Sequence, residues 1–269
     1  MLVFSNFNNG VLTEYNLSKT NLGAIGGMMA NKSAVTFQLK LLKCKLQFVG
    51  CHLESGESEK ANQQRLTQLQ TILPAIVDDA TGVDGIVKKK SQGVFAAGMG
   101  FMGSLLNLAT ASDSSPDIYR PHVAFAMGDM NFRVAMNATQ CLALTRDIKQ
   151  KHLQGAKMQE VLDMILAEDQ LTKALREIRQ LRKLREKKIS FMPTYKLEEF
   201  QNEYSREKER TPSWTDRVLT YSSQQSSLEV EEYRNMPNVF GSDHRPVFLV
   251  AQVDLRVDQD GLPEKIDLI

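Results

Sequence analysis

Four short polar clusters, each placed where an apolar run begins or ends, most constrain how this chain can fold. They are CHLESG at 51–56, GDMNFR at 128–133, PSWTDR at 212–217 and GSDHRP at 241–246. Residues at the ends of strands lie on loops at the rim of a sheet, where binding and catalytic groups concentrate over a rigid scaffold. The sequence therefore predicts a sheet with one functional rim, built from segments far apart in the chain.

The apolar pattern between these clusters favours a layered α/β sandwich. Strands are predicted where apolar runs are short and bounded by turn residues, at 1–4, twice within 34–50, at 123–127 and at 247–253. Helices are predicted from apolar residues at helical spacing, over 58–77 and as one long pattern over 158–188. Strands alternating with helices are typical of layered α/β architectures.

Two stretches depart from this pattern. Residues 80–120 are rich in Gly, Ala and Met and follow three lysines, which predicts a surface insertion. It is either a loop or a hydrophobic segment that touches lipid. Residues 173–188 carry eight basic side chains and two glutamates. This charge pattern indicates either a solvated helix face or a surface that contacts an anionic partner. We expect one catalytic domain over 1–255, incomplete at its N-terminus, and a C-terminal tail over 256–269.

Composition excludes several classes of protein. Of the 269 residues, 42% are hydrophobic and 24% are charged, near the globular average, and the net charge is +1. No bulk charge favours nucleic acid or an anionic membrane, so no nucleic-acid partner is expected. Three cysteines form no disulfide framework, which fits a reducing compartment. With no signal peptide or membrane span recognised, we expect a cytoplasmic protein, with contact at a membrane surface left open.

The polar clusters contain candidates for acid–base chemistry. In an extended segment Asp129 and Asn131 point to the same side, either as a water-holding carboxylate beside a neutral donor or as a simple Asx turn. His244 can move a proton near neutral pH if a partner such as Asp216 fixes its tautomer. His52 ends a predicted strand and is either catalytic or structural. Together these residues suit metal-assisted hydrolysis of a phosphate ester, with oxygen ligands around a hard cation.

Separated cationic residues on loops near this cluster could grip further phosphates on one ligand, although any one alone could be an isolated surface lysine. The candidates are Tyr195, Lys196, Lys208, Arg210, Asn31 and Lys32.

In combination and in order, the motifs ANKSAV, CHLESGES, GDMNFR, EDQL, FMPTYK, KERTPSWTDRVL and GSDHRPV resemble the inositol polyphosphate 5-phosphatases. The resemblance covers about residues 1–250. It implies the DNase I-like endonuclease/exonuclease/phosphatase fold, an α/β two-sheet sandwich flanked by helices, which we expect here to lack its first strands. It also implies Mg²⁺-dependent removal of the 5-phosphate from a phosphoinositide head group, such as phosphatidylinositol 4,5-bisphosphate, or from a soluble inositol phosphate. Protein partners are not indicated.

The resemblance also implies residue roles. Asp129 would hold or activate the attacking water, and Asn131 would stabilise the transferring phosphoryl group. His244 would contact the scissile phosphate, oriented by Asp216. The remaining positions and their implied roles are His52 as a further phosphate contact, Asp243 in support of the metal and water, Tyr195, Lys196, Lys208 and Arg210 on the neighbouring 4-phosphate, Asn31 and Lys32 as substrate-binding residues in the family's NKGG-type loop, and Arg217 as a substrate-binding residue beside the site.

The chain departs from the family pattern in three places. Ser33 replaces a glycine after Asn-Lys, and Cys51 replaces a serine before the histidine. The N-terminal part that supplies a strand Asn and the principal metal-binding Glu has no counterpart, so we expect that main metal ligand to be absent from this chain. Two alternatives therefore stay open, namely a catalytically inactive phosphoinositide-binding fragment and a nuclease of the same superfamily.

Overall fold

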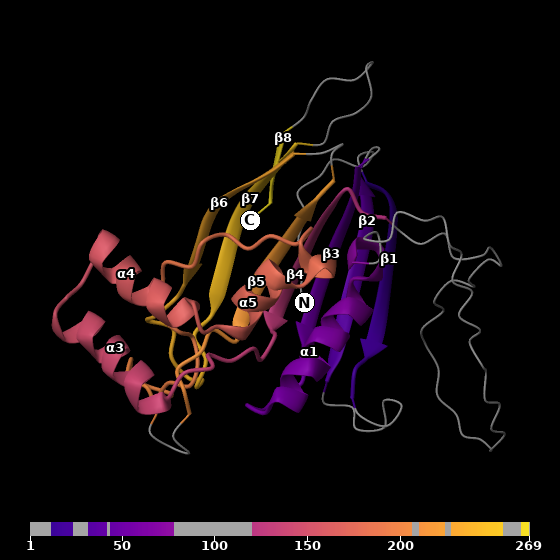
Figure 1. The fold of residues 1–269 in the computed structure, drawn as a ribbon. Helices are drawn as coiled ribbons and strands as arrows, with labels where there is room; N and C mark the ends of the chain where they lie inside the picture. The colour runs from indigo at the N-terminus through magenta and orange to yellow at the C-terminus, as the bar shows by residue number, and fades with distance from the viewer. Residues whose placement is uncertain are drawn as a thin grey trace, which may run out of the picture.

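The structure is a computed structural model, and it describes residues 12–23, 32–41, 44–77, 120–205, 210–223, 227–254 and 265–268. The strand predicted at 1–4 and nearly all of the insertion predicted at 80–120 lie outside these ranges. Two β-sheets face each other, with helices over the outer face of the first sheet and beside the second (Figure 1). The expected two-sheet α/β sandwich is therefore confirmed for the described part of the chain.

The first sheet has five described strands in the order β1-β2-β3-β4-β5. They are β1 (Leu12–Asn21), β2 (Ser33–Leu41), β3 (Cys44–His52), β4 (Val123–Asp129) and β5 (Asp216–Ser222). All neighbours are antiparallel except β3 and β4, which run parallel. A parallel pair needs a crossover connection, and the chain between residues 53 and 122 makes it.

The second described sheet has the order β6-β7-β8 and is antiparallel throughout. Its strands are β6 (Ser227–Asn235), β7 (Val247–Asp254) and β8 (Lys265–Leu268). The core between the two sheets is made by side chains from β2, β3 and β4 against β7, including Leu46, Phe125 and Ala251. Alternate residues of β4 point the other way, so Ala124 and Ala126 join a different core.

Helices α1 (Glu59–Ile72), α2 (Pro74–Val77) and α5 (Gln170–Glu177) cover the outer face of the first sheet, where Leu69 and Leu171 pack with Ala126 and Leu219. Helices α3 (Ala138–Gln150) and α4 (Gly155–Leu166) pack around Trp214 and Tyr233, beside the second sheet. Figure 1 shows α3 and α4 apart from α1 and α5, next to β6 and β7. Among the described residues, no helix is both long and apolar enough to cross a bilayer.

Side-chain caps decide where three of these helices begin. Ser58 Oγ accepts from the backbone N–H of Ala61 at 3.2 Å, ahead of α1. Asn137 Oδ1 caps α3 in the same way. Each cap satisfies a backbone donor that the first helical turn leaves open, and its loss typically costs about 1 kcal/mol.

The prediction of one long helix over 158–188 is wrong. The first helix, α4, ends at Leu166, and Asp169 caps α5 by accepting from the backbone N–H of Thr172 at 2.8 Å. After a short 3-10 turn at Arg179–Leu181 the chain becomes extended, and Arg185 pairs with Thr220 of β5. Apolar spacing alone could not show that Asp169 is held by a tertiary ion pair with Arg217, which fixes the break.

The remaining sequence predictions of elements are confirmed within about two residues, at β2, β3, β4, β7 and α1 with α2. Five elements were not predicted, namely β1, α3, β5, β6 and β8.

Candidate active site

Three predicted site residues stand opposite one another across the first sheet. His52 at the end of β3 pairs with Asp129 at the end of β4, and Asp129 pairs with Asp216 at the start of β5. Asp129 shares the alternation of Phe125, so its side chain belongs to the face turned toward the second sheet. The strand register therefore collects these three groups at one rim.

Gly128 makes this register possible. Its φ of +135° lies in a region that L side chains rarely adopt, and a Cβ there would come within 2.0 Å of the Cys51 carbonyl oxygen. Only glycine allows β3 and β4 to approach this closely beside the pair of His52 and Asp129.

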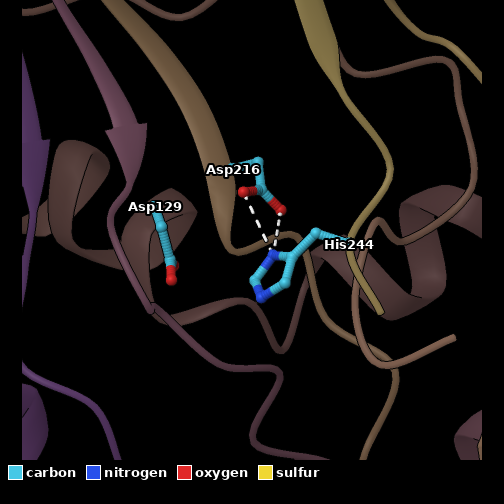
Figure 2. Close-up of side chains that lie close together, drawn as sticks. All are labelled: Asp129, Asp216 and His244. Atoms are coloured by element: carbon cyan, nitrogen blue, oxygen red, sulfur yellow. Dashed lines mark hydrogen bonds and ion pairs between the residues drawn. The ribbon is translucent and has the colours of Figure 1, made fainter. Parts of the chain in front are cut away.

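His244 arrives from the loop before β7 and meets Asp216 (Figure 2). Its Nδ1 lies 2.9 Å from Asp216 Oδ2 and 3.2 Å from Oδ1. Two hydroxyls also donate to Asp216 Oδ2, from Thr194 at 2.7 Å and Thr215 at 2.9 Å. The carboxylate is thus held in place from several sides, and it orients the imidazole as the sequence analysis predicted.

The pKa shifts of Asp129 and His244 give these two residues different roles. Burial raises the pKa of Asp129, and the nearby charge of Asp216 raises it further. Burial alone would lower the pKa of His244, but the hydrogen bond and charge of Asp216 outweigh it, so the pKa is raised. Asp129 is therefore suited to take a proton nearer neutral pH than a free carboxylate, and His244 is suited to stay charged.

Asn131 sits between Asp129 and a buried arginine. Its backbone φ is +57°, and its backbone N–H donates to Asp129 Oδ1 at 3.0 Å. Its side-chain Nδ2 donates to Asp129 Oδ2 at 3.1 Å, and Arg133 donates to its Oδ1 at 2.6 Å. The Asx-turn hydrogen bond is therefore present, and the Asn131 amide contacts the Asp129 carboxylate through this turn and not through an extended segment.

His52 is bound from the other side of Asp129. Its Nε2 lies 2.7 Å from Lys32 Nζ and 3.4 Å from Asp129 Oδ2. Burial lowers the pKa of His52, and the Lys32 charge lowers it further. Burial also lowers the pKa of Lys32. A neutral His52 can accept a hydrogen bond from the Lys32 ammonium, so both residues join the site from adjacent strands.

Some of the residues predicted to bind the neighbouring phosphate lie within the described part of the chain. The Tyr195 ring lies against His244 with centroids 4.5 Å apart, which brings this residue into the site. Lys196 follows it and is half-buried. Arg210 pairs with Glu57 at 3.3 Å, and the pair joins the loop after β3 to the segment that leads into β5. Asn31 and Lys208 lie outside the described residues.

The structure corrects the assignment of Arg217 to substrate binding. The guanidinium is fully buried on the opposite face of β5 from Asp216, because successive strand residues point to opposite faces. It pairs with Asp169 at 2.9 Å and Glu186 at 2.5 Å. These buried charges and hydrogen bonds raise the pKa of Arg217 against the effect of burial, which by itself lowers it. Arg217 is therefore part of the scaffold.

Sequence reasoning missed three residues of this site. Thr194 and Thr215 fix Asp216, and Arg133 fixes Asn131. All three lie inside motifs already singled out, PTYK, PSWTDR and GDMNFR. Their place in these motifs was the available signal, because Asn131 has a φ of +57° and strand alternation does not apply between it and Arg133.

One group of described residues could hold a metal ion. Asp129, Asp216 and His244 each offer one ligand atom, and these atoms lie within 4.8 Å of one another. The two carboxylates suit a hard divalent cation, which completes its shell with water and phosphate oxygens, whereas His244 in its charged form is a donor and not a metal ligand. A cation there would also relieve the repulsion that raises the pKa of Asp129. The donor set therefore fits. Asp243, predicted to support the metal, is not in this group, and its backbone carbonyl accepts from Leu197 N–H at 2.9 Å.

A family model, Endonuclease/Exonuclease/phosphatase family 2, matches residues 1–250. The chain belongs to this family. Among its relatives, phosphatidylinositol polyphosphate 5-phosphatase type IV of Mus musculus is 36% identical over 140 residues, which are 52% of this chain and 20% of that protein. The chain thus spans far less than the length of this relative. The resemblance to inositol polyphosphate 5-phosphatases is confirmed by this match.

Two solved structures share the fold. The inositol polyphosphate 5-phosphatase domain of SPsynaptojanin, in complex with inositol (1,4)-bisphosphate and a calcium ion, superposes with a TM-score of 0.61. The match has 20% identity and covers 90% of this chain and 55% of that one. A Cimex nitrophorin, in a ferrous NO complex, gives 0.58 at 18% identity, covering 92% and 66%. One fold thus carries different functions, and function has to be argued from the site.

Proposed function

We propose that this chain hydrolyses the 5-phosphate of a phosphoinositide or a soluble inositol polyphosphate, with Mg²⁺ bound at the rim of the first sheet. The observation that carries the proposal is the convergence of Asp129, Asp216 and His244 beside Asn131. The named activity of the relatives and the bound inositol bisphosphate of the synaptojanin domain support the substrate class.

Their protonation states give His244 and Asp129 different roles in the proposed reaction. His244 donates its Nδ1–H to Asp216, and with a raised pKa its other ring nitrogen carries a proton that can be donated to a phosphoryl oxygen. Asp129, with its raised pKa, holds the attacking water and takes a proton from it. A bound magnesium ion would supply charge neutralisation at the phosphoryl oxygens.

Asn131 supplies a neutral donor on the same side as Asp129, where charge develops in the transition state. Tyr195, Lys196, Lys208 and Arg210 would hold the neighbouring 4-phosphate and orient the scissile group. Arg210 must leave Glu57 to do so, and the cost is small because exposed ion pairs contribute about 0–1 kcal/mol.

The test is phosphate release by the purified chain from phosphatidylinositol 4,5-bisphosphate in short-chain form and from inositol 1,4,5-trisphosphate, each with Mg²⁺. We expect release of the 5-phosphate, its loss in EDTA, and a fall in kcat of about 10²–10³-fold for Asn131→Ala. Asp147→Asn changes an exposed acid that pairs only with Lys151 on α3 and serves as the control. No release from either substrate by the wild-type chain would refute the proposal, and EDTA-resistant binding without turnover would favour an inactive head-group-binding protein.

A further inference from the structure

Arg133 is a buried cation without a buried counter-charge. Its exposed fraction is 5%, and among the described residues it has no ion-pair partner within 4.0 Å. One of its terminal nitrogens, Nη1, is buried and has no hydrogen-bond partner there. A buried unpaired charge costs free energy, so its contacts must supply something other than stability.

Those contacts converge on Asn131. The Arg133 Nη2 donates to Asn131 Oδ1 at 2.6 Å, and Nε donates to the Asn131 backbone carbonyl at 3.1 Å. Arginine has donors and no acceptor, so the atom it faces on the amide must be the oxygen. The amide NH₂ is thereby forced to the other side, toward Asp129 Oδ2 at 3.1 Å and the Leu53 carbonyl at 3.2 Å.

The same guanidinium supports the histidine side of the site. It lies 4.7 Å from the centroid of the Tyr195 ring, and that ring lies 4.5 Å from the His244 ring. A planar guanidinium stacks on an aromatic face in a way that a lysine ammonium does not reproduce. Arg133 therefore contacts both the residue beside the general base and the residue beside His244.

We propose that Arg133 is a positioning residue of this site: with the two acceptors on the other side, it fixes the Asn131 amide so that the NH₂ group, and not the oxygen, faces Asp129. The inference rests on the proposed function for its kinetic consequence. Without Arg133 the Asn131 side-chain oxygen loses this donor, and the amide is held only through its NH₂ group, so it can rotate away from the position beside Asp129.

The kinetic test is a double-mutant cycle between Arg133→Met and Asn131→Ala. We expect Arg133→Met alone to lower kcat by about 10- to 100-fold, and to lower it by less than about 3-fold in the Asn131→Ala background. Arg65→Met is the matched control, because Arg65 is also buried and stacks on Phe132 at 5.4 Å, yet it binds the carbonyls of Glu54 and Gly56. Its effect should be similar in both backgrounds. An Arg133→Met effect of equal size in both, or no effect in either, overturns the proposal.

Two further measurements separate positioning from stability and from the proposed function. The melting temperature of Arg133→Met should stay within about 4 °C of wild type. The side-chain NH₂ signal of Asn131, assigned by its loss in Asn131→Ala, should be well dispersed in wild type and move to the random-coil position in Arg133→Met. A signal that does not move overturns the proposal. If wild type shows no turnover, the proposed function fails, and this signal alone decides the role of Arg133.

Discussion

The close approach of β3 and β4 at Gly128 allows a quantitative prediction for Gly128→Ala. The added Cβ would lie 2.0 Å from the Cys51 carbonyl oxygen and 3.0 Å from its carbon. Restoring an ordinary carbon–oxygen separation of about 3.3 Å requires a displacement of roughly 1.3 Å between the two backbones. The Cys51 oxygen and carbon belong to the backbone, and the position of the added Cβ is fixed by the backbone of residue 128, so no side-chain rotation can absorb this displacement.

The expected loss of stability has two parts. A non-glycine residue in this part of backbone space costs about 1–3 kcal/mol. Forcing atoms into a packed interface costs about 1–3 kcal/mol more. For a chain of this size each kcal/mol lowers the melting temperature by about 2–4 °C, so we expect a fall of roughly 5–20 °C.

Thermal unfolding followed by circular dichroism measures this, with Gly155→Ala as the matched control. Gly155 also has a positive φ, +55°, but a Cβ there meets nothing within 4 Å. The control should lose only about 1–2 kcal/mol. Below its melting temperature Gly128→Ala should also lose turnover, because the next paired residues are His52 and Asp129. If the two variants melt within about 2 °C of each other, the close approach does not constrain the sheet and the reasoning is wrong.

Three further predictions concern the Asp216–His244 pair, the Glu57–Arg210 pair and the buried cysteines. Asp216→Asn should lower the pKa of His244, seen in the imidazole NMR titration, and reduce kcat by about 10²-fold. Since the pKa is raised in the folded state, the pair's contribution to stability is full below about pH 6.5 and is lost as pH rises through the folded pKa, and Asp216→Asn should remove this dependence. Glu57→Gln should free Arg210 and lower KM for a 4,5-bisphosphate about 2- to 5-fold with kcat unchanged, and an unchanged KM would show that Arg210 does not bind this substrate. The three cysteines should resist maleimide labelling until the protein is denatured, because burial raises each thiol pKa to about 11 or 12, and rapid native labelling would contradict this for Cys44, Cys51 and Cys141.

Much of the site could be predicted because its residues end strands. Asp129, Asp216 and His244 are adjacent to apolar runs, and the rim of a sheet brings such residues together whatever their separation in sequence. The error at Arg217 came from treating neighbours in a motif as neighbours in space. Once β5 is known to begin at Asp216, the alternation of strand side chains sends the next residue to the opposite face.

The parts of the fold that could not be predicted depend on tertiary contacts. The break at Asp169 follows from an ion pair with a residue 48 positions later, which no local periodicity reveals. Strand β6 carries exposed glutamates at 229 and 231 on its solvent face, so it lacks an apolar run. The contact between Arg133 and the Asn131 amide oxygen depends on side-chain geometry, which the sequence does not give.

The alternation of β5 has a consequence for how this protein can change. One residue inserted at the start of β5 would reverse the faces that Asp216 and Arg217 occupy. The Arg217 guanidinium would turn toward the rim, and the Asp216 carboxylate would join those of Asp169 and Glu186 on the buried face. Folding and chemistry would fail together, because the buried face would gather three carboxylates without their arginine and His244 would lose its carboxylate partner at the rim. Length variation is therefore barred from this strand and confined to loops, where substrate preference can be altered without touching the reaction.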